Sequence, residues 1–300
     1  MKAVQFAEYG GPEVLQLVHI DPPHPRPGQV RIAVRAAGVN GIDWKVRSGV
    51  MREQMPLPLP AGTGMDAAGV VDEIGDGVTG VAIGDAVFGT GSATFATHAV
   101  LSSWASIPDG LSFTEAAGYP IPVETAIRIL NQVGVQPGQT LLVSGAAGGV
   151  GSAVVQIARQ RGITVIGTAS ERNHAYLRSL GATATTYGPG LVDRVRAIAP
   201  HGIDAALDIA GSGVIPELIE LTGTPARVLS IADFSAPSHG AQVSSVSVDP
   251  AAAFAEVARL YTQGGFHLPV EKTFSLEQAA EAQRASADGH VAGRLVVVIS

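Results

Sequence analysis

The sequence predicts an α/β protein of two domains, one rich in β structure and one built around a parallel sheet. Three observations support this. A length of 300 residues is comfortable for two domains, because one domain usually takes ~100–200 residues. Up to about residue 110, short runs rich in Val and Ile alternate with turn signals. From about residue 122, short β runs are separated by helix-length segments, which is typical of βαβ units.

The first region has the pattern of a barrel-like antiparallel domain. Proline- and glycine-rich turns such as DPPHPRPG, LPLPAGTG and GDGVTG separate its apolar runs. The predicted strands are Met1–Phe6, Gln29–Ala36, Ala68–Ile74 and Asp85–Phe88.

The second region predicts a doubly wound parallel sheet with strands at Thr140–Ser144, Thr164–Gly167, Ala205–Ile209 and Val228–Ile231. The end of the chain then returns to a helix over Leu276–Ala285 and an apolar run over Arg294–Ile299 that resembles a barrel strand. We therefore expect an α/β domain over residues 121–264, inserted into a β-rich domain made of residues 1–120 and 265–300.

The composition excludes several classes of protein. The chain has no cysteine, which rules out disulfide frameworks, thiolate zinc sites, iron–sulfur clusters and cysteine nucleophiles. A net charge of −7 without a basic run argues against a nucleic-acid partner. No apolar stretch approaches the ~18–20 residues of a membrane span, and the start, MKAVQFAEYGG, is unlike a signal peptide. These features predict a cytoplasmic protein without a membrane partner.

The sequence also lacks a metal or hydrolase signature. The eight histidines form no i, i+4 pair, and no G-x-S-x-G motif occurs. No metal ligand is predicted.

The strongest local signal is the segment TLLVSGAAGGVG, which begins at Thr140. An apolar strand leads into a glycine cluster and then an amphipathic helix, the context that a dinucleotide-binding turn requires. The spacing is Ala146-x-Gly148-x-x-Gly151, with alanine at the usual first glycine. Gly148 would let the backbone approach a diphosphate, Gly151 would allow close packing, and the N–H groups of Gly149 and Val150 would face the ligand.

The residues after the second strand indicate NADPH. An NAD site needs a carboxylate at the strand end for the ribose hydroxyl, yet Thr168-Ala-Ser-Glu-Arg-Asn173 has no acid there. Ser170 and Arg172 can bind a 2′-phosphate, with Asn173 beside them. Glu171 is the main argument for NAD, but it comes later than expected. A solvated Arg172 at a helix start is the simpler alternative.

Six segments in order carry a family resemblance over nearly the whole chain. They are AAGVNGIDWKVRSG, PAGTGMDAAGVVDEIGDGV, GDAVFG, PVETAIRIL, VQPGQTLLVSGAAGGVGSAVVQIA and GHVAGRLVVVIS. Together they resemble the zinc-free quinone oxidoreductase branch of the medium-chain dehydrogenase/reductase superfamily. The resemblance implies a GroES-like catalytic domain and a Rossmann domain, with NADPH and substrate bound between them, and a homodimer. Zinc-dependent relatives carry a cysteine at Asn40 and a His-Glu pair near Met65-Asp66, and both are absent here.

The resemblance also assigns site residues. The Asn matching Asn40 lines the active site near the nicotinamide, where an amide can hydrogen-bond an oxygen that gains charge. Several relatives have tyrosines at Lys45 and Met51, so their roles do not transfer. Lys45 is a candidate proton donor, although a surface lysine on a short helix is the simpler interpretation.

Four further residues have family counterparts or a structural interpretation. Tyr187 matches a position near the 2′-phosphate or adenine. Thr125 belongs to a Thr-Ala motif that begins a helix at the domain junction, where capping alone would explain it. Asp43 and Arg47 are interpreted as an internal ion pair that shapes their loop.

The leading functional hypothesis is an NADPH-dependent, zinc-independent reductase of a small apolar quinone or α,β-unsaturated carbonyl compound. The loops Met51–Pro60 and Ala232–Ala241 contain few polar residues, which favours an apolar substrate. Two alternatives stay open. One is an enoyl reductase tailoring enzyme of polyketide or lipid metabolism. The other is a catalytically silent NADPH-binding sensor, because a fold alone does not prove turnover.

Overall fold

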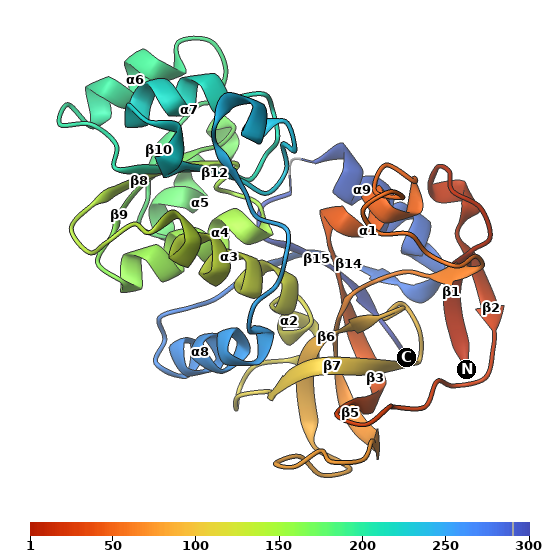
Figure 1. The fold of residues 1–300 in the computed structure, drawn as a ribbon. Helices are drawn as coiled ribbons and strands as arrows, with labels where there is room; N and C mark the ends of the chain where they lie inside the picture. The colour runs from red at the N-terminus through yellow and green to blue at the C-terminus, as the bar shows by residue number, and fades with distance from the viewer. Residues whose placement is uncertain (290) are drawn as a thin grey trace. The chain divides into compact units, whose positions relative to one another are not determined.

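The computed structural model describes residues 1–289 and 291–300 and divides into two compact units (Figure 1). The barrel unit comprises Met1–Ile121 and Asp249–Ser300, and the sheet unit comprises Pro122–Val248. The α/β class with a β-rich and a parallel-sheet domain is therefore confirmed.

The barrel unit is organised around β3 (Val30–Val39). This long strand pairs antiparallel with β5 (Asp66–Ile74), β7 (His98–Ser106) and β15 (Arg294–Val298). Strands β5, β6 (Ala86–Ser92) and β7 form an antiparallel meander, and the β3–β7 pairing closes it into a ring. The other elements of this unit are β1 (Lys2–Phe6), β2 (Gln16–His19), α1 (Gly41–Arg47), β4 (Ala61–Gly62), β6 (Ala86–Ser92), α2 (Phe113–Ala116), α8 (Pro250–Thr262), β14 (Val270–Ser275) and α9 (Ala279–Asp288).

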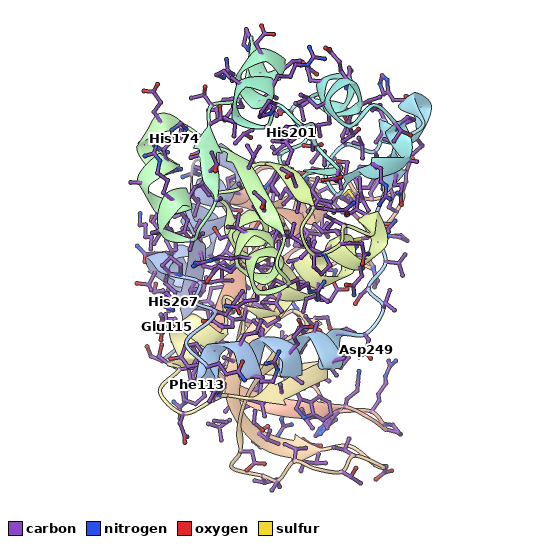
Figure 2. The ribbon with its side chains drawn as sticks, turned by 90° about the vertical axis from the view of Figure 1, so that its left-hand side faces the viewer. Phe113, Glu115, His174, His201, Asp249 and His267 are labelled. Atoms are coloured by element: carbon purple, nitrogen blue, oxygen red, sulfur yellow. The ribbon has the colours of Figure 1, made fainter. Side chains whose placement is uncertain are left out.

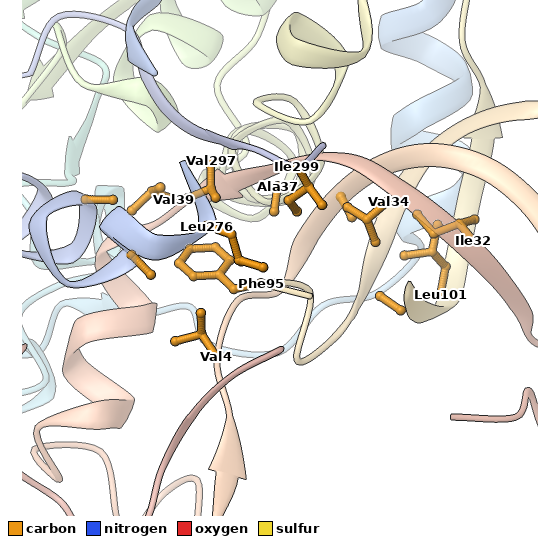
Figure 3. Packing of buried hydrophobic residues seen from close by; sticks show 14 of the residues in the cluster. Val4, Ile32, Val34, Ala37, Val39, Phe95, Leu101, Leu276, Val297 and Ile299 are labelled. Atoms are coloured by element: carbon orange, nitrogen blue, oxygen red, sulfur yellow. The ribbon is translucent and has the colours of Figure 1, made fainter. Parts of the chain in front are cut away.

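Alternation along the strands produces the core of the barrel unit. Every second residue of the first half of β3, at Val30, Ile32 and Val34, is buried, whereas the residues between them are partly exposed. These valines and isoleucines pack with Leu101 and with Phe95, which is fully buried (Figure 3). A core of branched aliphatic residues around few aromatic rings agrees with an aromatic content of 5%.

The sheet unit contains six parallel strands in the order β10-β9-β8-β11-β12-β13. Numbered along the chain, this order is 3-2-1-4-5-6, the arrangement of a dinucleotide-binding sheet with its switch point between β8 and β11. The strands are β8 (Thr140–Ser144), β9 (Thr164–Thr168), β10 (Thr183–Thr185), β11 (Ala205–Asp208), β12 (Val228–Ser230) and β13 (Gln242–Val243). The helices are α3 (Pro120–Val133), in which the boundary between the units falls, α4 (Gly149–Gln160), α5 (His174–Ser179), α6 (Leu191–Ile198) and α7 (Ile215–Thr222).

The central strand β8 is covered on both faces. Leu141, Leu142 and Val143 are consecutive and each has an exposed fraction of 0%. Leu142 belongs to a cluster that includes α6 and α7 residues such as Val195 and Leu218, and α4 packs against β8 and β9. Continuous burial is the sequence signature of a parallel strand between two helical layers.

The second domain boundary differs from the prediction. Residues 250–262 form α8, which packs on β6 and β7 of the barrel unit, so the chain crosses back at 248/249 rather than at 264/265. An amphipathic helix after a parallel strand is typical of a βαβ unit, so the local sequence pattern predicted that residues 250–262 belong to the sheet domain.

Candidate functional site

The glycine-rich turn joins β8 to α4 and contains Gly145, which was not among the predicted site residues. Gly145 has a φ of +79°, in the left-handed region that favours glycine. The turn is held against the neighbouring strand, because the Ala146 N–H donates to Thr168 O at 3.1 Å and the Gly145 N–H donates to Thr168 Oγ1 at 3.3 Å. Gly145 therefore makes the tight turn, and Ala146 lies buried behind it.

Gly148 and Gly151 have different surroundings. A Cβ on Gly148 would meet only Gly145 O, at 3.8 Å, so the backbone there faces open space. A Cβ on Gly151 would lie 2.3 Å from Gly145 O and 2.6 Å from Ala146 Cα. Gly151 is thus required for packing α4 against the turn. Gly148 caps α4, and the first-turn N–H groups at Gly149 and Val150 have no partner within the helix. This end of α4 is a cradle suited to a diphosphate.

The end of β9 carries no carboxylate. Thr168 is buried, and its hydroxyl accepts a hydrogen bond from the Gly145 N–H, so this side chain already binds the glycine-rich turn. Ser170 and Asn173 are half-buried, whereas Glu171 and Arg172 are exposed. The four residues lie at the start of a short 3-10 turn that leads into α5.

Strand register brings Tyr187 to the same edge of the sheet as Ser170. In the parallel pairing of β10 and β9, Thr185 is opposite Thr168, and each site residue lies two positions beyond its strand end. Tyr187 is 54% exposed. Arg194 fixes its loop, because the guanidinium donates to Tyr187 O at 3.3 Å and to Pro189 O at 2.7 Å.

Thr125 lies inside α3 rather than at its start. The helix begins at Pro120, so the expectation that Thr125 begins a helix, with capping as its role, is wrong. Thr125 is 6% exposed, and its Oγ1 accepts a hydrogen bond from Arg128 Nη2 at 3.4 Å. Arg128 also pairs with Glu124 at 2.9 Å and donates to Ser244. Thr125 is therefore part of a buried polar group of the sheet unit.

In the barrel unit, Asn40 lies where three strand ends meet. It follows β3, and both β5 and β15 begin beside it because they run antiparallel to β3. Asn40 Nδ2 donates to Asp66 Oδ2 at 2.8 Å, and Arg294 Nη2 donates to Asn40 Oδ1 at 2.9 Å. The Asn40 backbone N–H donates to Asp43 Oδ2 at 2.7 Å. The amide is thus held on both its nitrogen and its oxygen.

The charges around Asn40 are almost completely removed from water. Exposed fractions are 3% for Asp43, 0% for Asp66 and 6% for Arg294. Burial raises the pKa of Asp43 to about 7, and the nearby Asp66 charge adds to this effect. Burial also raises the pKa of Asp66 to about 7, although Arg294 and hydrogen bonds from Asn40 and Ile121 oppose it. Two carboxyl groups around one guanidinium therefore favour retention of one proton near neutral pH.

The predicted ion pair between Asp43 and Arg47 does not form. The Arg47 guanidinium instead donates to Gln283 Oε1 at 2.8 Å and to Gly10 O at 2.7 Å. Asp43 Oδ1 is buried and, among the described residues, has no hydrogen-bond partner. Residues four apart share a helix face, but Gln283 of α9 and the Gly10 carbonyl bind the Arg47 guanidinium in place of Asp43.

The two positions where relatives carry tyrosines are both in or after α1. Lys45 is half-buried, and its Nζ lies 5.7 Å from the centroid of the Trp44 ring. Met51 is 7% exposed in the turn that follows the helix.

No group of three or more metal-ligating side chains occurs among residues 1–289 and 291–300. The labelled histidines of Figure 2 lie on separate elements, with His174 at the start of α5 and His201 after α6. His267 forms an exposed pair with Glu115 at 4.0 Å. Nor does any helix of the described chain combine the length and apolar character needed to cross a membrane.

Sequence reasoning missed Asp66 and Arg294 as site residues, although both are at the first position of an apolar strand. The signal available in the sequence was a charged residue at the first position of an apolar strand, because a buried charge needs a partner. It also missed Asp208, a buried residue at the end of β11 that accepts from Gly211 N at 3.0 Å and from Ser230 Oγ at 2.9 Å.

Comparison with known proteins agrees with this architecture. Residues 26–113 match the family model described as alcohol dehydrogenase GroES-like domain, and residues 180–297 match the one described as zinc-binding dehydrogenase. The quinone oxidoreductase of Rattus norvegicus is 34% identical over 242 residues, which cover 77% of this chain and 73% of that protein.

Solved structures are similar over the whole chain. The quinone oxidoreductase of Coxiella burnetii has a TM-score of 0.89 and 32% identity, covering 100% of this chain and 99% of that one. Mycobacterial Rv1454c, solved in complex with NADPH, has a TM-score of 0.88 and 25% identity over 99% of both chains.

A GroES-like barrel joined to a dinucleotide-binding sheet defines an oxidoreductase of the medium-chain dehydrogenase/reductase superfamily. Within that superfamily, the chain belongs to the quinone oxidoreductase branch. The resemblance noted from the sequence is confirmed.

Proposed function

We propose that the protein is an NADPH-dependent reductase that delivers hydride to a quinone or an α,β-unsaturated carbonyl compound without zinc. The observation that carries the proposal is the carboxyl edge of the parallel sheet. There the open backbone at Gly148 lies at the switch point, and the adjacent strand ends in Ser170 and Arg172 instead of a carboxylate. A nicotinamide dinucleotide with a 2′-phosphate matches both features.

The chemistry of the donor groups favours NADPH over NADH. The helix N-terminus at Gly149 and Val150 would hold the diphosphate, while Ser170, Arg172 and Asn173 would hold the 2′-phosphate. Tyr187, exposed at the same edge, would cover the adenosine end. The NADPH complex of the mycobacterial neighbour supports the same assignment. Thr125 is proposed to line the cofactor site from α3.

Bound NADPH would supply the hydride, and Asn40 would stabilise the acceptor oxygen as it gains charge. One Asn40 N–H donates to Asp66, so the second N–H is left for that oxygen, since it makes no hydrogen bond among the described residues. Lys45 is the candidate for returning a proton. A Lys45→Met variant that loses kcat while keeping its affinity for NADPH would support that role, and an unchanged kcat would remove it.

The residues around Asn40 also support zinc-independent chemistry. The Arg294 guanidinium lies 2.9 Å from Asn40 Oδ1, so the side-chain oxygen of Asn40 already faces a positive charge. A metal cation at that oxygen would be repelled. Activity that persists after incubation with EDTA agrees with this proposal, and a loss restored by zinc would contradict it.

The acceptor is tested by a screen of quinones, enones and alkenals that follows NADPH absorbance. Turnover of quinones or simple enones supports the proposal. Activity confined to enoyl thioesters would instead assign an enoyl reductase, and NADPH binding without turnover on any acceptor would assign a sensor. A homodimer is proposed from the family resemblance, and light scattering of the purified chain tests it.

A further inference from the structure

We infer that Asp66 and Arg294 are positioning residues that fix the orientation of the Asn40 amide, so that its NH₂ group rather than its oxygen is offered to the acceptor. Neither residue is part of the dinucleotide-binding turn, because both lie in the barrel unit. Only the expected effect on turnover rests on the proposed function. The hydrogen-bond pattern that carries it is independent of any ligand.

The two contacts permit a single orientation of the amide. Asp66 Oδ2 accepts from Asn40 Nδ2 at 2.8 Å, and Arg294 Nη2 donates to Asn40 Oδ1 at 2.9 Å. Rotating the amide by 180° would place its oxygen against a carboxylate oxygen and its NH₂ group against a guanidinium. Both new contacts would be repulsive and buried. The free N–H of Asn40 therefore keeps a fixed direction.

Asp66 must accept on both of its oxygens. Its Oδ1 accepts from the Ile121 backbone N–H at 3.0 Å, while Oδ2 accepts from Asn40 and lies 3.5 Å from Arg294 Nη2. Asparagine at this position would present one oxygen and one NH₂ group, so at least one of the three donors would face another donor. Only a carboxylate satisfies all three contacts.

The backbone makes room for this arrangement at Gly38. In the β3–β5 register, Gly38 is opposite Asp66. A Cβ on Gly38 would lie 2.3 Å from Ala117 O and 3.1 Å from Asp66 Oδ2. This glycine near the end of β3 thus leaves space for the carboxylate to reach Asn40.

The test uses the full chain with ¹⁵N-labelled asparagine. The sequence contains three asparagines, so three side-chain NH₂ pairs are expected, and an Asn40→Ser variant identifies the pair from Asn40. In the wild type this pair should show two well-separated proton shifts and slow exchange with water. In Asp66→Asn the separation should shrink and exchange should accelerate. With NADPH and a reducible acceptor, kcat should fall about tenfold or more, while the Kd for NADPH stays within twofold.

The matched control is Asp72→Asn. Asp72 is on the same strand β5 and also pairs with an arginine, with its Oδ1 3.0 Å from Arg31 Nε. This variant should leave the Asn40 signals and kcat unchanged. If Asp66→Asn does not fold, Arg294→Lys replaces it, because lysine keeps the positive charge but loses the planar guanidinium that donates to Asn40 Oδ1.

The outcomes separate this inference from the proposed function. Unchanged Asn40 signals in both Asp66→Asn and Arg294→Lys overturn the positioning role, whatever the activity. Equal changes in Asp72→Asn also overturn it, because they indicate a general effect on the strand. A wild type without turnover contradicts the proposed function, yet the NH₂ signals still decide whether Asp66 and Arg294 hold the amide.

Discussion

The side chains of Asn40 and Asp66 meet at 2.8 Å although 26 positions separate them in the chain, and both are almost fully buried. The contact is possible because β3 ends where its antiparallel neighbour β5 begins. Arg294 reaches the same point from the start of β15. A buried charged group beside a candidate catalytic amide makes the stability of the barrel unit depend on pH.

The first prediction concerns Asp43 and the retained proton. Asp43 Oδ1 has no hydrogen-bond partner among the described residues, whereas both oxygens of Asp66 accept, so we expect the proton on Asp43. The folded protein then binds a proton that the unfolded chain releases above its ordinary pKa of 3.8. Wild-type stability from this group therefore falls as pH rises from about 4 to about 7 and is constant above that.

Asp43→Asn removes this titration, because its amide resembles the protonated acid. The free energy of unfolding of the variant relative to wild type should rise by on the order of 1 kcal/mol per pH unit across that window. Urea denaturation at pH 5, 6, 7 and 8 measures the difference. A difference that does not change with pH would place the proton elsewhere.

The second prediction contrasts Asp66 with Asp43. Asp66→Asn leaves either the Ile121 N–H or the Asn40 NH₂ group buried without an acceptor, which lowers the free energy of unfolding by about 1–3 kcal/mol. At pH 8, Asp66→Asn should therefore be less stable than wild type, and Asp43→Asn should not. Thermal and urea unfolding of the two variants side by side provide the measurement. The reverse order would show that the assignment of the two carboxyl groups is wrong.

The third prediction concerns the glycine turn. Gly148→Val should abolish NADPH binding and leave the fold intact, because φ of −72° and ψ of 173° suit any residue and the added Cβ enters open space. Gly151→Ala is the contrasting variant, since its Cβ would lie 2.3 Å from Gly145 O and should destabilise the sheet unit. Titration calorimetry and thermal unfolding distinguish the two effects. Affinity of Gly148→Val within a few-fold of wild type would refute the diphosphate assignment.

The fourth prediction concerns cofactor choice. A hydrogen bond to a charged group contributes ~1.5–3 kcal/mol, and exposure of Arg172 favours the lower end because solvent screens its charge. NADPH should bind on the order of 10–100-fold more tightly than NADH, with a preference that shrinks as salt rises. Arg172→Ala should weaken NADPH binding and leave NADH binding nearly unchanged.

The control for that variant is Arg178→Ala, which removes another exposed arginine from α5. It should leave both affinities unchanged. Equal losses for NADPH and NADH in Arg172→Ala would assign the residue to loop support or adenine stacking. A wild type that prefers NADH would direct attention to Glu171.

Local pattern was enough to predict four of the six strands of the sheet unit, namely β8, β9, β11 and β12. The strand Thr140–Ser144 has the same bounds in the sequence analysis and in the structure, because an apolar run, a glycine turn and an amphipathic helix are all encoded within about 20 residues. The barrel was harder. Strand β7 (His98–Ser106) was not predicted, because Ser102, Ser103 and Ser106 interrupt the alternation that marks a strand.

The sequence by itself determined the two-domain α/β class, the family and the strand–turn–helix unit that begins at Thr140, because each depends on neighbours along the chain. Only the tertiary structure decided what surrounds Asn40. Arg294 lies 254 positions away, and it reaches the amide through the register of β15 on β3. Hydrogen bonds between strand ends depend on pairing in space, and no periodicity in the sequence records which ends will meet.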